Sequence, residues 1–250
     1  MRPRSIWPAL ALAVSCAATP PQAATPGEAL YRKMEAALAA AKNLQVEFES
    51  TFDASSVKGS FKIEDGNKLD MKVEGQAGAK RYSLTLASTG PKMVLTRAET
   101  PPPPVPLEPQ PELPTPAALT ANVAACLARG GAWLAQEVAE TEYRMAADAY
   151  FEERQAKKEG RPFKPRPAAP LVVAEMHTLQ NFRPGKSEGG ATAVTYDLVR
   201  KSGSPVLAAV VTVWIDAKGL PIKREGFFAT LDGKPAGVPS SKWSETYSFK

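Results

Sequence analysis

The sequence predicts an α+β fold, in which about ten antiparallel strands form one curled, open sheet and helices pack on its concave face. Apolar and polar residues alternate over two blocks, 44–97 and 171–249, and the connections inside each block are short. Short connections exclude parallel pairing, which requires crossovers of about a dozen residues or more. The third observation is helical spacing of apolar residues before the first block and between the two blocks.

A helix is predicted at the start, from Pro26 to Lys42. The stretch from Thr25 to Glu28 has the spacing of a capping box, with proline at the first helical position, and Leu30 begins an apolar stripe that continues at helical spacing. The first block of strands follows directly. Its predicted strands are 44–52, 57–64, 67–74, 81–87 and 92–97, with a two-residue hairpin turn at Asp65 and Gly66.

A proline-rich spacer at residues 100–116 separates the first block from a helical insertion at residues 117–159. Thr115 and Pro116 repeat the signal for a helix start, and the helical pattern runs to about Glu153. We expect this region to bend at Gly130 and Gly131. The whole insertion is expected to pack on the concave face of the sheet.

The second block contains the strands 171–182, 192–200 and 242–249 and a hairpin at Leu207–Glu225. β-branched and aromatic residues precede the Asp216 to Gly219 turn, and Pro221 stands at the start of the return strand, where proline is tolerated. Residues 155–170 are rich in lysine, arginine and proline. They predict a solvated loop, with contact to anionic lipid headgroups at a membrane surface as the alternative.

Size and charge limit the functions open to this chain. With 250 residues and 44% hydrophobic content, it can bury one substantial core. The formal net charge is +5, and it falls to roughly +3 when Arg2 and Arg4 leave with a signal peptide. This excess is too small to indicate a nucleic-acid partner. We expect no nucleic acid among the partners and a monomeric state.

Residues 1–24 are predicted to be an export signal, because two arginines precede an apolar stretch that ends in small residues. The segment before Cys16 resembles a lipobox, so residues 1–15 would be removed and Cys16 lipidated. Ala17 favours delivery to the outer membrane by resemblance to lipoprotein sorting signals. The alternative is ordinary cleavage between Ala17 and Ala24. Either way the expected location is the periplasm, with outer-membrane anchoring in the first case.

Motifs for catalysis and metal binding are almost absent from the sequence. His177 is the one histidine, which excludes a multi-histidine metal site and leaves little basis for a Ser-His-Asp triad. Cys126 lies in a helical pattern, where a small buried apolar residue is the expected role. We therefore expect no enzyme activity, no cofactor and no metal.

The helix, the meander that begins LQVEFEST and the hairpin VWIDAKGLPIKRE resemble the LolA/LolB-like lipoprotein carriers in order and spacing. The resemblance covers residues 26–100 and 171–250. We expect residues 25–250 to form one domain of this kind. The resemblance implies an open antiparallel β half-barrel lidded by helices, a periplasmic location and binding of lipids or lipoproteins. The latching Arg-Pro of those carriers has no counterpart here, where Asp65 to Leu69 stands instead, so a divergent branch is indicated.

Two functions follow from these observations. The first is a carrier or acceptor that binds lipid acyl chains or lipoproteins in the half-barrel; the alternative is a periplasmic sensor or scaffold that binds a partner protein with the same fold. Trp133, beside the predicted bend, is expected where the helical lid meets the opening. The predicted ligand-binding residues are the inward residues of the first block together with this tryptophan: Phe48, Phe52, Phe61, Leu69, Met71, Leu84, Leu86 and Trp133.

Overall fold

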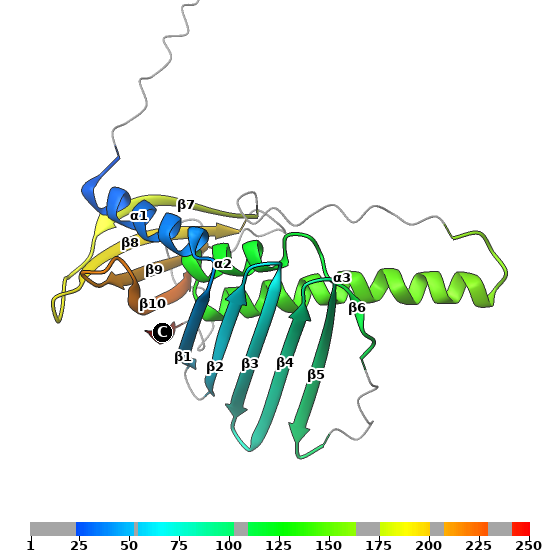
Figure 1. Ribbon diagram of the computed structural model, residues 1–250. Helices are drawn as coiled ribbons and strands as arrows, with labels where there is room; N and C mark the ends of the chain where they lie inside the picture. The colour runs from blue at the N-terminus through cyan, green and yellow to red at the C-terminus, as the bar shows by residue number, and fades with distance from the viewer. Residues whose placement is uncertain (1–23, 53–54, 103–109, 164–175, 201–207, 230–241) are drawn as a thin grey trace, which may run out of the picture.

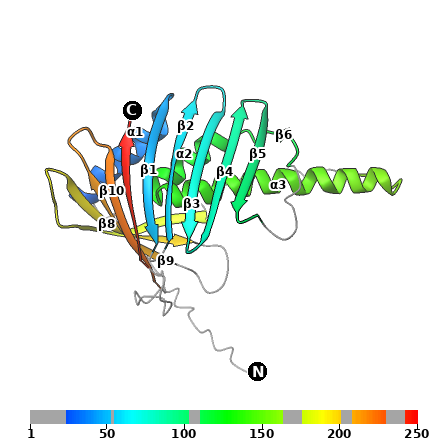
Figure 2. The same cartoon turned by 90° about the horizontal axis from the view of Figure 1, so that it is seen from below.

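The computed structural model describes residues 24–52, 55–102, 110–163, 176–200, 208–229 and 242–250. Within these residues, three helices cover one face of a single antiparallel sheet (Figure 1, Figure 2). The predicted α+β class and the open antiparallel sheet are confirmed. Cys16 and the predicted signal lie outside the described residues, apart from Ala24 at its end.

The sheet has 11 strands in the order β6-β5-β4-β3-β2-β1-β11-β10-β9-β8-β7. The strands of the first block are β1 (Leu44–Phe52), β2 (Ser55–Glu64), β3 (Lys68–Ala77), β4 (Lys80–Thr89), β5 (Lys92–Thr100) and β6 (Leu113–Pro114). Those of the second block are β7 (His177–Pro184), β8 (Thr192–Arg200), β9 (Ala208–Ile215), β10 (Pro221–Ala229) and β11 (Lys242–Phe249).

The two blocks meet where β1 pairs with β11, in the middle of the sheet. Phe48 faces Tyr247 and Phe52 faces Trp243 across this join. Because side chains alternate between the faces of a strand, the inward residues of both blocks line one continuous face. The predicted strands 44–52, 192–200 and 242–249 have the observed bounds. The strands predicted at 57–64, 67–74, 81–87 and 92–97 are longer than predicted, although β3 begins at Lys68, one residue later than expected.

The helices are α1 (Pro26–Ala40), α2 (Leu119–Arg129) and α3 (Ala132–Lys158). Thr25 caps α1 as predicted, because its Oγ1 accepts a hydrogen bond from Glu28 N at 3.1 Å. The helical insertion breaks at Gly130 and Gly131, also as predicted. The two-residue strand β6 was not predicted, since two residues, one of them a proline, carry no alternation that could reveal a strand.

The concave side of the sheet is filled by side chains of the sheet and the helices. Six of the predicted ligand-binding residues are exposed by no more than 3%, and they belong to one hydrophobic core that includes residues of all three helices. Leu38 of α1, Val123 of α2 and Leu134 of α3 are buried in the same core. The helices therefore act as the second layer of the domain core.

One part of α3 does not join this core. The helix crosses behind the strands and runs on past β5, as both views show (Figure 1, Figure 2). After Ala147 its only buried residue is Ala156. We call residues 148–158 the overhang.

Candidate functional site

Two charged side chains are completely buried at the centre of the concave face. Arg224 on β10 and Glu245 on β11 are cross-strand partners, and each has 0% exposed surface. A buried charge is strongly destabilising unless it is paired or hydrogen-bonded. Both side chains meet this condition by binding the junction between α2 and α3. We call these two residues the clamp.

Arg224 binds the end of α2. Its Nη1 donates to the carbonyl oxygen of Leu127 at 3.0 Å, and its Nη2 donates to the carbonyl oxygen of Ala128 at 2.9 Å. The last carbonyls of a helix lack partners within the helix and carry the negative end of its dipole. A guanidinium group at this position therefore satisfies two acceptors and is stabilised by the dipole.

Glu245 binds the beginning of α3, where its charge is opposite to that of Arg224 at the end of α2. Its Oε2 accepts a hydrogen bond from Ala132 N at 2.9 Å, and its Oε1 accepts from Trp133 N and from Ser50 Oγ, both at 3.0 Å. These are N–H groups at the positive end of the helix. The clamp thus holds both helix ends at the bend, each with the charge that its dipole favours.

The bend itself requires glycine at position 131. Gly131 has φ 98°, in the left-handed region that side chains disfavour. A Cβ at this position would also overlap Glu245 Oε2 and the Tyr247 hydroxyl group. The backbone approaches the clamp closely because this residue has no side chain.

Tyrosines complete the buried polar centre. Tyr31 of α1 donates its hydroxyl to the carbonyl oxygen of Ala128 at 2.9 Å, and Tyr247 accepts from Arg224 Nη1 at 3.0 Å and donates to Glu245. Burial raises the pKa of both tyrosines well above the ordinary value, so they stay neutral. Burial alone would lower the pKa of Arg224, but the tyrosines and Glu245 raise it, so the guanidinium stays charged.

An open cleft lies beside the clamp, between α3 and one end of strands β1 to β4. Its volume is about 470 Å³, which is within the range of ligand-binding pockets. Its walls come from the ends of four strands and one face of α3. The lining residues are Phe48, Ser50, Phe52, Ser55, Val57, Gln76, Ala77, Tyr82, Trp133, Gln136, Glu137, Glu140 and Arg144.

Phe52 and Trp133, which line the base of the cleft, belong to an aromatic cluster. The ring of Trp133 lies 5.7 Å from that of Phe228 and 6.1 Å from that of Trp243, both in edge-to-face geometry. Phe52 stacks on Trp243 at 6.5 Å. Because Glu245 of the clamp accepts the backbone N–H of Trp133, the clamp holds the backbone from which this indole projects.

The rim of the cleft on α3 is charged. Glu137 pairs with Arg200 at 3.0 Å, and Glu140 pairs with Arg97 of β5 at 3.5 Å. Arg144 is exposed and donates a hydrogen bond to Thr141 Oγ1 at 3.3 Å. An apolar base with a polar rim suits a ligand that has one apolar part and one polar part.

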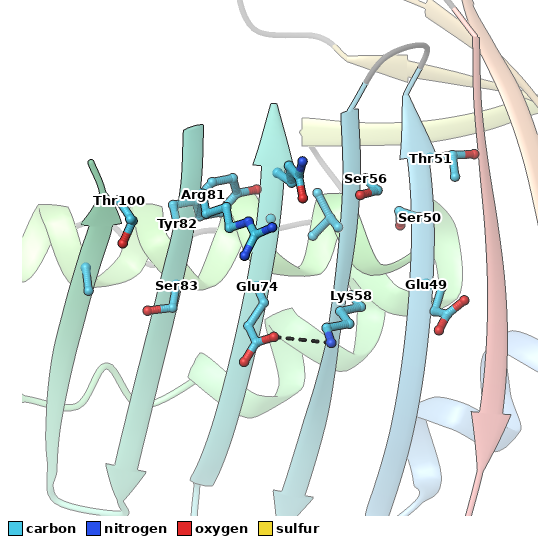
Figure 3. Close-up of a pocket in the computed structure, with 14 residues that line it drawn as sticks. Glu49, Ser50, Thr51, Ser56, Lys58, Glu74, Arg81, Tyr82, Ser83 and Thr100 are labelled. Atoms are coloured by element: carbon cyan, nitrogen blue, oxygen red, sulfur yellow. Dashed lines mark ion pairs between the residues drawn. The ribbon is translucent and has the colours of Figure 1, made fainter. Parts of the chain in front are cut away.

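A second hollow lies mainly on the face of the sheet turned away from the helices (Figure 3), and four residues line both it and the cleft: Ser50, Val57, Gln76 and Tyr82. Its volume is about 520 Å³, and small residues such as Ser83 and Thr100 stand among longer charged ones. Lys58 and Glu74 form an ion pair across it at 3.4 Å, but both side chains are 67% exposed, so the pair contributes little to stability. Tyr82 is the one aromatic residue in the lining of this outer hollow, whereas Phe48, Phe52, Tyr82 and Trp133 line the cleft, and we regard the cleft as the better candidate site.

The predicted ligand-binding residues are divided between the cleft and the core. Phe48, Phe52 and Trp133 line the cleft. The other five are buried under the helices and have no contact with the cleft: Phe61, Leu69, Met71, Leu84 and Leu86.

The clamp was not predicted. The signal for Glu245 was present, because it alternates with Trp243 and Tyr247 and so shares their inward face. Arg224 gave a weaker signal, since a register shift between Pro221 and Lys223 disturbs the alternation in β10.

The described residues contain no group of three or more histidine, cysteine, aspartate or glutamate side chains that could hold a metal ion. His177 is buried, and this burial, together with Arg200 and Arg129, lowers its pKa to about 4. Burial raises the pKa of the Cys126 thiol to about 12, so it stays protonated. No helix in the described part of the chain is long and apolar enough to cross a membrane.

Comparison with known proteins gives little further information. No family model matches the chain, and no curated protein matches its sequence, so the LolA/LolB resemblance stays a prediction. Among solved structures, the crystal structure of MucB in complex with MucA(peri) is similar to this chain at a TM-score of 0.32 and 11% identity, covering 90% of this chain and 54% of that one. This chain therefore spans about half the length of the MucB chain. A likeness of this size gives no information on function.

Proposed function

We propose that this chain is a non-enzymatic binding protein that works in the periplasm, and that its cleft receives an apolar side chain or short apolar segment of a partner protein. The observation that supports this function is the contrast between a filled concave face and an open cleft. Residues that a large acyl-chain cavity would need, such as Leu84 and Met71, are packed in the core. The space that remains is about 470 Å³, and seven of its thirteen lining residues are polar or charged.

The rim adds support for a protein partner. The side chains of Arg144 and Gln136 stand around the aromatic base and can form hydrogen bonds with a peptide backbone or polar side chains. Interfaces commonly combine aromatic anchors at the centre with a polar periphery. The cleft has this arrangement on a small scale.

A single acyl chain of a lipid or lipoprotein is the second candidate ligand. Phe52, Val57 and Trp133 give the base of the cleft enough apolar surface to hold part of such a chain. Anchoring of the protein to the outer membrane through Cys16 is compatible with either function and stays a proposal.

Photo-crosslinking from inside the cleft tests this function. A photoreactive phenylalanine analogue replaces Ala77, which is exposed and lines the cleft, and a control carries it at Lys62, which is exposed and lies away from the cleft. Crosslinked products from the native host are separated by mass spectrometry into protein and lipid adducts. We expect a protein adduct from position 77 that is absent from position 62.

A second variant shows whether the adduct depends on the cleft. Val57→Glu places a carboxylate at a half-buried position in the cleft, and we expect it to remove the adduct while the protein still folds. Lipid adducts alone would favour the acyl-chain function. No specific adduct at all, or one unaffected by Val57→Glu, would overturn both. Leu84→Glu is unsuitable here, because Leu84 is 1% exposed and its replacement would disrupt the core.

A further inference from the structure

The wall that α3 contributes to the cleft changes in character along the helix. Four of its residues recur at spacings of three or four along one face: Trp133, Glu137, Glu140 and Arg144. The first is aromatic and the last is cationic. With a rise of about 1.5 Å per residue, these two residues lie about 16 Å apart along the helix. The cleft therefore has an aromatic end and a polar end.

The strand wall follows the same gradient. Phe52 of β1 stacks on Trp243, which contacts Trp133, so it lies at the aromatic end. Burial raises the pKa of Tyr82 of β4, and Glu140 raises it further, so the hydroxyl group lies near the polar end and stays protonated. Within the described residues this hydroxyl group makes no hydrogen bond. It is available to donate to a ligand.

Both carboxylates of the cleft lining are already neutralised. Glu137 pairs with Arg200 at 3.0 Å. Glu140 pairs with Arg97 at 3.5 Å, and its Oε1 accepts a hydrogen bond from Gln136 at 2.9 Å. A cationic group of a ligand would have to compete with two arginines for these oxygens. The carboxylates therefore do not favour a cationic ligand.

Arg144 has no such counterion in the part of the chain that the structure describes. Its guanidinium group donates to Thr141 Oγ1, a neutral acceptor, at 3.3 Å, and it forms no ion pair. Glu99 of β5, which lies opposite Tyr82 in the ladder, is not part of the cleft lining and does not pair with it. Arg144 still has N–H groups to donate. The polar end of the cleft is suited to an anion.

The middle of the cleft favours a peptide as the carrier of that anion. Gln136, Glu137 and Glu140 lie between the two ends of the α3 wall, and Ser55 and Gln76 stand on the strand wall. A methylene chain that crossed this region would cover polar groups without forming hydrogen bonds to them, which is unfavourable. A peptide backbone carries both donors and acceptors along its whole length.

We infer that Arg144 selects an acidic residue in the partner segment, about five positions from the apolar side chain that binds beside Trp133. An extended segment advances about 3.3 Å per residue, so five residues cover about 16 Å, the separation of the two ends. Tyr82 provides a further donor at the same end. An acidic partner segment presupposes that the cleft binds a protein, as proposed above.

Three matched peptides test this selection with the full chain. Each is an acetylated and amidated octapeptide of serine and threonine, with phenylalanine at position 2 and glutamate, glutamine or lysine at position 7. NMR chemical shifts of the isotope-labelled protein measure binding, and the indole signal of Trp133 reports on the aromatic end. We expect the glutamate peptide to bind about threefold to fivefold more tightly than the glutamine peptide, and the lysine peptide to bind most weakly.

Charge reversal at Arg144 provides the sharpest comparison. Arg144→Gln should make the glutamate and glutamine peptides bind equally, and Arg144→Glu should make the lysine peptide bind more tightly than the glutamate peptide. Arg154→Gln is the matched control, because Arg154 is an exposed arginine of the same helix outside the cleft, and it should keep the wild-type order. Salt at about 1 M, where the Debye length is about 3 Å, should reduce the preference of wild type for the glutamate peptide.

Several results would overturn the inference. Equal binding of the glutamate and glutamine peptides by wild type, a preference that persists in Arg144→Gln, or absence of saturable binding by all three peptides would each do so. Arg144 is exposed, so the variants should fold, and circular dichroism checks this. The comparison of the three peptides with wild type remains decisive if a variant does not fold.

Crosslinking from Ala77 separates this inference from the proposed function of the cleft. A protein adduct that forms with unchanged yield in Arg144→Glu would reject the acidic segment and leave the function in place. Absence of any specific adduct from wild type would reject the function itself. A fatty-acid adduct that Arg144→Gln removes would assign Arg144 to a lipid carboxylate and would overturn the inference of an acidic protein segment.

Discussion

The two ends of α3 belong to one helix but lie in opposite surroundings. At its beginning, two backbone N–H groups donate to Glu245, the preceding helix is bound by Arg224, and Leu134 is buried in the core. At its other end, Phe151 is exposed and the helix extends beyond the sheet. The 27 residues of α3 span about 40 Å, so a fixed end and a free end can coexist in one element. The fixed end belongs to the core, and the free end is available for contact with other molecules.

The clamp should have the largest effect on stability. Arg224→Met leaves the Glu245 carboxylate buried without its cationic neighbour, and we expect a loss of about 3 to 5 kcal/mol in the free energy of unfolding. Urea denaturation measures this loss. Arg183→Met is the control, because Arg183 is partly exposed and pairs with Asp197 at the surface, where the expected loss is below about 1 kcal/mol. Equal losses in the two variants would show that the clamp does not hold the fixed end.

His177 should make the fixed end sensitive to acid. Its carbonyl oxygen accepts a hydrogen bond from Arg129 at the end of α2, and its own pKa is lowered to about 4 by burial and by Arg200 and Arg129. The unfolded chain, with an ordinary histidine pKa of about 6.5, binds more protons between these two values. The free energy of unfolding should therefore fall as the pH decreases from about 6.5 to 4, by up to about 3 kcal/mol.

Comparison with His177→Gln isolates this contribution from that of the carboxylates. The variant should show a smaller loss of stability over the same pH range in urea denaturation. If wild type and variant lose stability in parallel, His177 is not the group responsible.

Asn67 should have an intermediate effect. Its side chain in the β2–β3 turn accepts a hydrogen bond from Thr120 N at 3.1 Å and donates to the carbonyl oxygen of Pro116 at 2.7 Å, so it caps the start of α2. Asn67→Gly removes both bonds without strain, because Asn67 has φ 62°. We expect a loss of about 1 to 2 kcal/mol in thermal or urea unfolding. Asp65→Ala in the same turn is the control and should change stability little, while a similar loss there would indicate a general effect of the turn.

The free end should contribute least. Phe151→Ser should change the free energy of unfolding by no more than about 0.5 kcal/mol, whereas Leu134→Ala, at the fixed end of the same helix, should cost about 2 to 5 kcal/mol. Both are measured by urea denaturation. A large loss for Phe151→Ser would mean that the overhang is part of the core after all.

The strands were largely predictable because their signal is local. In β1, β8 and β11, alternation alone predicted the observed bounds, since the polarity of each residue indicates the face of the sheet on which its side chain lies. The bend at Gly131 was predictable for a similar reason, because two adjacent glycines interrupt a helical pattern.

The site was less predictable because it depends on distant contacts. Glu245 accepts a hydrogen bond from the backbone N–H of Ala132, 113 residues away in the sequence, and no pattern within β11 indicates that partner. In β10, simple alternation places Ile222 and Arg224 on one face, but the register shift leaves Ile222 38% exposed and Arg224 buried. The cleft depends on where α3 crosses the strand ends, which the helical pattern does not specify. Only Phe48, Phe52 and Trp133 of the predicted ligand-binding residues line it.

The position of β11 between β1 and β10 has a consequence for the folding reaction. The hydrogen bond between Ser50 and Glu245 joins residues 195 positions apart, and among the described strands the two blocks pair only through this last strand. Contacts so distant in sequence require closure of a long loop and slow the folding of a chain. Until β11 is in place, β1 and β10 each present an unpaired edge, and Arg224 lacks the neighbouring carboxylate. Pairing of β11 therefore completes the sheet and, in the same step, places the Glu245 carboxylate beside Arg224.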